Sequence, residues 1–109
     1  MKLNPKLIED TGWIDLVLQN GTTQRNGNQY KPQVRRIGKI VYMKGQVNIP
    51  AHTSDIAIAN IPLGYRPAWE TIMPAFNGTN WIDTKGVIWV GVNNTATTNQ
   101  KIYSSWTID

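Results

Sequence analysis

Short stretches of alternating apolar and polar residues recur along the chain. This two-residue period is typical of β-strands, and no stretch shows the 3.6-residue period of an amphipathic helix. Ile14, Leu16 and Leu18 fall on one face, and Asn20–Gly21 then supplies residues that tolerate a positive φ. Roughly seven short strands are expected. They cover residues 14–18, 34–37, 40–49, 56–58, 71–76, 85–93 and 102–108.

The clearest predicted element is a hairpin formed by residues 34–37 and 40–49. Gly38–Lys39 is its two-residue turn, with glycine first, as a type II′ turn prefers. Pro50 lacks the backbone N–H that a strand ladder needs, so it is expected to end the second strand. The polar segments 24–31 and 94–100 are expected to be exposed loops. The apolar residues that share one face of the second strand are Val41, Met43, Val47 and Ile49.

This pattern predicts an all-β fold, an antiparallel β-sandwich of jelly-roll-like character in a single domain. A chain of 109 residues suits one domain, and 40% hydrophobic residues are enough for a core. Residues 1–12 are expected to be an N-terminal connecting segment, and residues 13–109 the β-sandwich head domain.

Composition and charge remove several classes of function. The chain has no cysteine, which excludes thiol chemistry and cysteine zinc clusters. No apolar run reaches the length of a membrane span, and the first six residues carry a proline and two lysines where a signal peptide would be apolar. The net charge of +4 is spread along the chain, and the neighbours Arg35 and Arg36 should point to opposite faces of a strand. Nucleic acid, membrane insertion, cofactors and metals are therefore not expected.

His52, Ser54 and Asp55 lie close together after Pro50 and contain the residue types of a Ser–His–Asp triad. A triad is defined by its geometry in space, and clustering within one loop is weak support for it. A glycosidase would need two carboxylates facing each other across a sugar, and no such pair stands out. We therefore expect a binding protein without catalytic residues, and not an enzyme.

The five tryptophans are the most informative side chains for binding. A flat aromatic ring packs on the apolar face of a sugar, while amide, carboxylate and guanidinium groups bond its hydroxyls. Trp81 lies between Asn80 and Asp83 in a segment expected to be a loop, and we predict that these three residues form part of a shallow saccharide site. Trp69 and Arg66 are a second candidate contact. Trp13, Trp89 and Trp106 are expected to be structural.

Four segments, read in order, resemble a known family: GWIDLVLQNG, VRRIGKIVYMKGQV, IPLGYRPAWETIMPA and GVIWVGV. The most specific parts are the hairpin at residues 36–42 and the Leu63–Pro67 segment. Together they resemble the C-terminal head, or receptor-binding, domains of tail fibre and baseplate proteins from phages and prophages of Gram-positive bacteria.

The resemblance implies a trimeric β-sandwich head on the virion tail, made in the host cytoplasm, that contacts other tail or baseplate proteins. It also implies recognition of a host cell-wall saccharide or polymer. Apolar residues on both faces of residues 85–93 also favour a homotrimer. Two alternatives remain open: a purely structural trimerising tip of the virion, and the carbohydrate-binding accessory domain of a tail-associated lysin.

Overall fold

The computed structural model describes residues 9–73, 80–91 and 97–108, and within them the chain forms three antiparallel sheets. The predicted all-β sandwich is confirmed. In chain order, the strands are β1 (Ile14–Asp15), β2 (Val17–Leu18), β3 (Thr23–Gln24), β4 (Gln33–Ile37), β5 (Ile40–Lys44), β6 (Gln46–Ile49), β7 (Ile56–Asn60), β8 (Thr71–Met73), β9 (Asn80–Ile82), β10 (Val87–Val90), β11 (Thr98–Lys101) and β12 (Ser104–Thr107).

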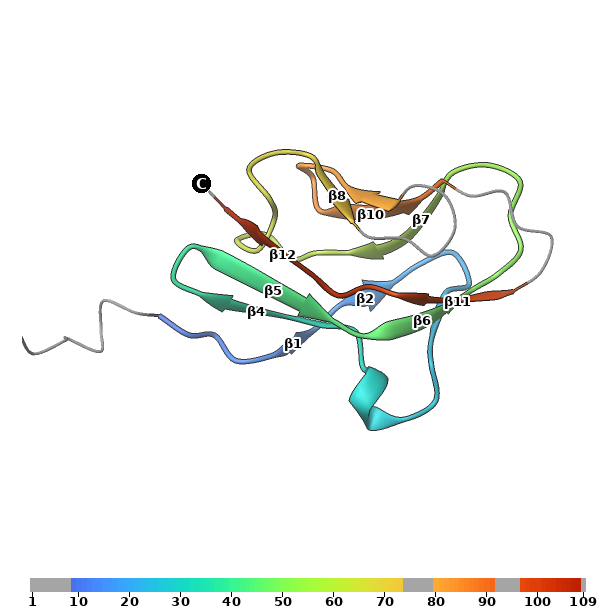
Figure 1. Cartoon of the computed structure of the whole chain (residues 1–109), viewed down its shortest axis with the longest axis horizontal. Coiled ribbons are helices and arrows are strands. Elements are labelled where there is room, and N and C mark those ends of the chain that lie inside the picture. The colour runs from blue at the N-terminus through green and yellow to red at the C-terminus, as the bar shows by residue number, and fades with distance from the viewer. Residues whose placement is uncertain (1–8, 74–79, 92–96, 109) are drawn as a thin grey trace, which may run out of the picture.

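Two of the sheets form one bent layer, because the same stretches of chain run through both. The sheet β1-β4-β5-β12 leads into the sheet β11-β6-β3 where β5 continues into β6 and β11 into β12 (Figure 1). The backbone N–H of Ile102 donates to the carbonyl of Gly45 at 3.0 Å and joins the two sheets at the bend. The five-stranded sheet β2-β7-β10-β9-β8 forms the opposite layer.

Gly45 makes the bend, and it divides the single strand expected over residues 40–49. Its φ is +134°, a backbone conformation that side-chain-bearing residues rarely adopt. A Cβ atom at this position would lie 2.6 Å from the Cα of Pro32, so the two backbones approach too closely for any other residue. The predicted hairpin turn is confirmed, since β4 and β5 pair around Gly38, which has a φ of +60°.

Leu16 divides the strand expected over residues 14–18 in a different way. Before it, β1 pairs with β4 in the bent layer; after it, β2 pairs with β7 in the five-stranded sheet. Leu16 itself is buried, and its backbone N–H donates to the carbonyl of Pro32 at 3.0 Å. This short stretch of chain therefore connects the two layers at one edge of the sandwich.

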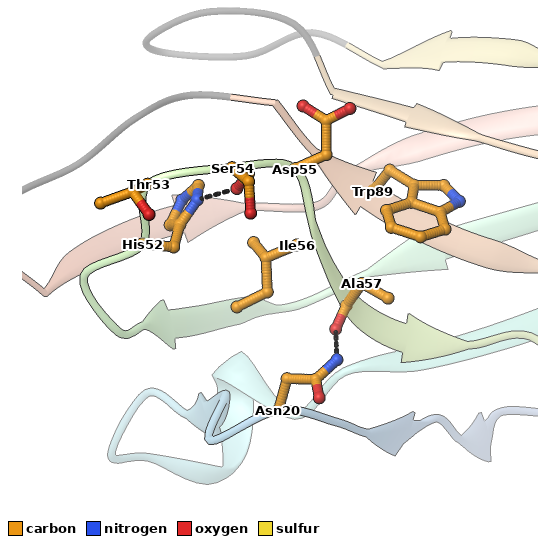
Figure 2. A pocket seen from close by; sticks show the side chains of 8 residues that line it. All are labelled: Asn20, His52, Thr53, Ser54, Asp55, Ile56, Ala57 and Trp89. Carbon is orange, nitrogen blue, oxygen red and sulfur yellow. Dashed lines mark hydrogen bonds between the residues drawn. The ribbon is translucent and has the colours of Figure 1, made fainter.

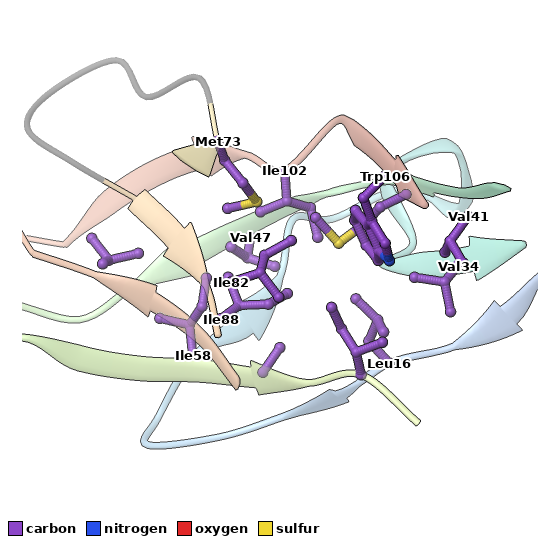
Figure 3. Close-up of a cluster of buried hydrophobic side chains, with 14 of the residues drawn as sticks. Leu16, Val34, Val41, Val47, Ile58, Met73, Ile82, Ile88, Ile102 and Trp106 are labelled. Atoms are coloured by element: carbon purple, nitrogen blue, oxygen red, sulfur yellow. The ribbon is translucent and has the colours of Figure 1, made fainter. Parts of the chain in front are cut away.

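The core lies between the layers (Figure 3), and the predicted inward face of residues 40–49 is confirmed. Trp106 closes the core near one end. Its indole N–H donates to the carbonyl of Tyr65 at 2.7 Å, which satisfies its one polar group. The buried apolar residues are Leu16, Val34, Val41, Met43, Val47, Ile49, Ile58, Ala59, Ile61, Met73, Ile82, Ile88, Val90, Ile102 and Trp106.

Two segments expected to be loops contain strands. β11 begins within the segment 94–100 and ends at Lys101, and its backbone pairs with β6 while the side chain of Gln100 is buried. β3 enters the polar segment 24–31 through Gln24 and pairs with the other side of β6. The loop prediction for 94–100 was wrong at residues 98–100, because pairing with a distant apolar strand stabilises a strand of polar sequence. The loop prediction for 24–31 is confirmed over residues 25–31, which form no strand and are mostly exposed.

The ends of several predicted elements differ from the observed ones. β8 covers only the first part of the strand expected at 71–76, and residues 74–79 and 92–96 lie outside the described part of the chain. Residues 9–12, expected to belong to a connecting segment, already pair with β4. The backbone N–H of Thr11 donates to the backbone carbonyl of Arg36 at 3.0 Å, and the backbone N–H of Gly38 donates to the backbone carbonyl of Glu9 at 2.8 Å. Over the described ranges, no helix has the length and apolar character needed to cross a membrane.

Candidate functional site

The outward face of the five-stranded sheet carries a row of apolar side chains. Register places Ile72 of β8, Trp81 of β9, Trp89 of β10 and Ala57 of β7 next to one another across the sheet. Trp81 and Trp89 each lie between two buried residues of their strands, and Ile72 and Ala57 each adjoin one buried residue, so alternation directs these four side chains away from the core. We call these four residues the outer row. Ile72 is 72% exposed, which is unusual for a large apolar side chain on a sheet.

Trp81 and Trp89 form a stacked pair at the centre of the outer row. Their ring centroids are 6.2 Å apart and their planes differ by 15°, which is an offset arrangement that indoles favour. Both side chains are half-buried, so part of each ring faces solvent. The expectation that Trp81 lies in a loop is wrong, because β9 pairs with a strand on each side. Trp89, which was expected to be structural, shares this partly exposed surface.

Asp83 holds the Trp89 indole in place. One carboxylate oxygen, Oδ2, accepts the indole N–H of Trp89 at 3.0 Å. The other, Oδ1, accepts the backbone N–H groups of Lys85 at 2.9 Å and Val87 at 3.0 Å. Burial raises the pKa of Asp83, but the hydrogen bonds from Trp89, Val87 and Lys85 outweigh it and leave the pKa below its ordinary value of 3.8. Asp83 is therefore a positioning residue whose bonds are made mainly within the chain.

Asn80 does not share this surface. Neighbouring residues of a strand point to opposite faces, and Asn80 points into the core, where its side chain is fully buried. Neither its amide nitrogen nor its carbonyl oxygen has a hydrogen-bond partner. The expectation that Asn80 and Trp81 line one surface is therefore wrong.

The second candidate pair, Trp69 and Arg66, divides into one exposed and one structural residue. The Arg66 guanidinium Nε donates to the carbonyl of Ile61 at 3.0 Å, and the side chain packs so closely on Gly86 that a Cβ there would lie 2.6 Å from Nε. Arg66 therefore fastens the segment before β8 to the turn between β9 and β10. Trp69 lies two residues before β8 and is 77% exposed.

An open pocket of about 490 Å³ adjoins the outer row at Trp89 (Figure 2). One wall is the loop that leads into β7, where His52 Nδ1 lies 2.7 Å from the carbonyl oxygen of Ser54. The opposite wall is Asn20, which has a φ of +56° and donates its amide N–H to the carbonyl of Ala57 at 2.6 Å. The lining residues are Asn20, His52, Thr53, Ser54, Asp55, Ile56, Ala57 and Trp89.

His52, Ser54 and Asp55, whose closeness in the sequence was weak support for a triad, lie together in the wall of this pocket. A carbonyl can only accept a hydrogen bond, so His52 Nδ1 carries the proton and bonds the main chain of Ser54, not its hydroxyl. These three residues do not form a triad in this arrangement. The pocket itself was missed because it also needs Asn20 and Trp89, which are distant in the sequence. Within the described ranges, no group of three or more histidine or acidic side chains could hold a metal.

The opposite face of the sandwich, on the bent layer, presents a tryptophan in a different setting. Trp13 is 37% exposed, and its ring lies 4.3 Å from Lys44 Nζ and 5.9 Å from Arg35 Cζ. Arg35 also pairs with Asp10, through Nε and Oδ1 at 2.8 Å, and this hydrogen bond lowers the pKa of Asp10 to about 2. Arg36 points to the other side and donates to the carbonyl of Gly38 at 2.7 Å, so the predicted opposite directions of the two arginines are confirmed.

No protein-family model, curated protein or solved structure matches this chain. The candidate site therefore rests on the geometry of the chain itself. Two half-exposed indoles with a polar pocket beside them can stack on the apolar faces of sugar rings and bond the hydroxyl groups around them.

Proposed function

We propose that this chain is an adhesive, receptor-binding domain of a phage tail fibre or baseplate, and that its outer row binds a saccharide of the host cell wall. The observation that carries the proposal is the stacked Trp81–Trp89 pair, which lies half-exposed on an outward sheet face. A sugar ring laid on these indoles would remove apolar area from water without requiring the sheet to move.

The setting of the pair supports binding in preference to simple packing. Asp83 fixes the Trp89 ring through its indole N–H, so little rotational freedom remains to be lost when a ligand binds. Trp106 shows the contrasting case, since it is buried in the core and its N–H is used by the main chain. Trp81 and Trp89 are instead placed where a ligand can reach them.

A single shallow site of this kind would be weak, with a Kd in the millimolar range and a binding free energy of about −4 kcal/mol. A homotrimer, which the family resemblance implies, would present three such sites together. Several linked sites that engage one surface raise the apparent affinity by orders of magnitude when their geometry allows simultaneous contact. Weak individual sites are therefore compatible with firm attachment to a cell wall.

The test is a pulldown of the purified chain with cell walls of the host, with walls from a non-host strain as the specificity control. Trp81→Ala should reduce the wall-bound fraction at least tenfold. Trp13→Ala removes an exposed tryptophan from the opposite face and should leave the bound fraction unchanged. Circular dichroism and thermal melting of both variants show whether the fold is retained. Loss of wall binding in Trp13→Ala, with binding intact in Trp81→Ala, would place the receptor site on the other face.

A structural role in a trimeric tip is the second candidate function, and the exposure of Ile72 favours it. An apolar side chain that is 72% exposed at the edge of the outer row is the kind of group that a neighbouring subunit covers. This role predicts that Trp81→Ala lowers the stability of the trimer in sedimentation experiments and leaves host-wall binding unaffected.

A further inference from the structure

We infer that the pocket beside Trp89 is a sub-site of the same face and accepts an uncharged sugar unit in preference to one that carries phosphate or carboxylate. The inference rests on the proposed saccharide function and narrows its ligand class. It starts from a shared wall: Trp89 belongs both to the outer row and to the pocket lining. A saccharide lying across Trp81 and Trp89 would therefore extend directly into the pocket.

The charge of the lining disfavours an anionic unit. Asp55 is exposed and contributes a carboxylate, and the described residues that line the pocket include no lysine or arginine. Asp83, which accepts the Trp89 indole N–H, is a second carboxylate near this wall, but Lys85 lies close enough to lower its pKa and offsets part of its charge. The repulsion of an anion therefore comes mainly from Asp55, and it acts over roughly one Debye length, which is about 10 Å at moderate salt.

The polar groups of the lining suit a neutral sugar. Thr53 and Ser54 are exposed and offer hydroxyl groups, each of which can donate and accept. Asn20 uses its amide N–H on the carbonyl of Ala57, which fixes the side chain and directs its carbonyl oxygen to act as an acceptor. Hydroxyl and acetamido groups of an N-acetylhexosamine present the complementary donors and acceptors.

The pocket is held in this form by short-range bonds within the chain. The His52–Ser54 contact closes the loop on one side, and the Asn20–Ala57 bond ties the β2–β3 turn to β7 on the other. Ile56 and Ala57 supply an apolar floor beside the Trp89 ring. A volume of about 490 Å³ falls within the range of small-molecule sites.

The test compares two probes that differ by one group: the tetramer of N-acetylglucosamine, and the same tetramer with a 6-phosphate on its terminal unit. Binding to the full chain is followed by titration with NMR or tryptophan fluorescence. The wild-type chain should bind the neutral tetramer at least tenfold more tightly. Asp55→Lys should reduce that ratio at least fivefold. Asp15→Lys makes the same change of charge on the opposite face and should leave the ratio unchanged.

Three outcomes would overturn the inference. These are a preference for the phosphorylated probe, equal effects of Asp55→Lys and Asp15→Lys, or no binding of either probe. If host-wall binding still depends on Trp81 in those cases, the proposed function stands and only the role of the pocket is wrong. If the wild-type chain binds no host wall at all, the proposed function fails and the inference fails with it.

Discussion

The two outward faces of this sandwich place tryptophans in opposite chemical settings. On the five-stranded sheet, Trp89 stacks on Trp81 and donates its indole N–H to the carboxylate of Asp83. On the bent layer, Trp13 lies under the cations of Lys44 and Arg35. The tryptophan pair on one face is therefore held by a carboxylate, whereas the Trp13 ring on the other face contacts two cations.

The difference shows that an exposed tryptophan does not define a ligand by itself. A lysine over an indole occupies the negative face of the ring and competes with any sugar that would stack there. Trp81 and Trp89 stack on each other, but both side chains are only half-buried, so part of each ring still faces solvent. The side chains around each tryptophan therefore decide which face suits a neutral saccharide. The pairing register of the strands determines which side chains these are.

Trp106 belongs to neither face, and its substitution should cause the largest loss of stability among the tryptophans of this protein. Trp106→Ala should lower the free energy of unfolding by about 3–5 kcal/mol, because it opens a cavity between the layers and leaves the Tyr65 carbonyl without its donor. Urea unfolding measures the effect. Trp69→Ala, at a highly exposed position, is the matched control and should cost less than about 0.5 kcal/mol. Similar costs for the two variants would contradict the placement of Trp106 in the core.

Asp83→Asn should remove the hydrogen bond that positions the Trp89 indole while keeping the bonds that stabilise the turn between β9 and β10. The amide can still accept the backbone N–H groups of Lys85 and Val87, but its NH₂ group cannot accept the indole N–H. We expect the free energy of unfolding at neutral pH to fall by about 1–2 kcal/mol, since the lost bond involves a charged acceptor that is partly solvated. Asp15→Asn on the opposite face is the control and should have a smaller effect, because its bonds are exposed.

The acid dependence of the Asp83 effect has a defined sign. Hydrogen bonds lower the folded-state pKa of Asp83 below the ordinary value of 3.8, so the folded state favours the carboxylate. Its contribution is complete above pH 3.8 and is lost as the pH falls through the lower folded-state pKa. The stability difference between wild type and Asp83→Asn should therefore shrink in acid. A difference that stays constant from neutral pH to pH 2 would show that the carboxylate charge is not involved.

The smallest expected effect lies on the bent layer, where Trp13 and Lys44 form a cation–π contact. A double-mutant cycle with Trp13→Ala and Lys44→Gln should give a coupling free energy of about 0.5–1 kcal/mol. High salt should reduce it, because the pair is exposed to solvent. A coupling of zero would mean that the two side chains are merely adjacent, and the contrast between the faces would then rest on the Trp81–Trp89 pair alone.

The fold followed from the sequence wherever an apolar pattern and a turn residue agreed. The β4–β5 hairpin, with glycine at its turn and Val41 and Met43 inward, is the clearest case. The pattern failed where tertiary pairing overrides composition, as in β11. The pattern also did not predict that the chain changes sheets at Gly45 and at Leu16. The change at Gly45 depends on the close approach of Pro32, and the change at Leu16 depends on the pairing of β2 with β7, and both are long-range contacts.

The candidate site was only partly accessible from the sequence. The residue types of Trp81 and Asp83 were informative, but their roles depend on Trp89, which cross-strand register brings beside them. Asn80 was placed on the wrong side because a strand was taken for a loop. The pocket joins Asn20 to the 52–57 segment, and no local pattern connects positions so far apart in the chain.

The crossing at Leu16 has a mechanical consequence. A force that pulls the chain at residue 9 acts first on the bonds of residues 9–15 to β4, and beyond Leu16 on the pairing of β2 with β7. Tension from the N-terminal side is thereby shared between both layers of the sandwich. To pull residues 9–18 out of the fold, the force must break hydrogen bonds in two separate sheets and expose the buried Leu16. The segment therefore resists unfolding from this edge of the sandwich.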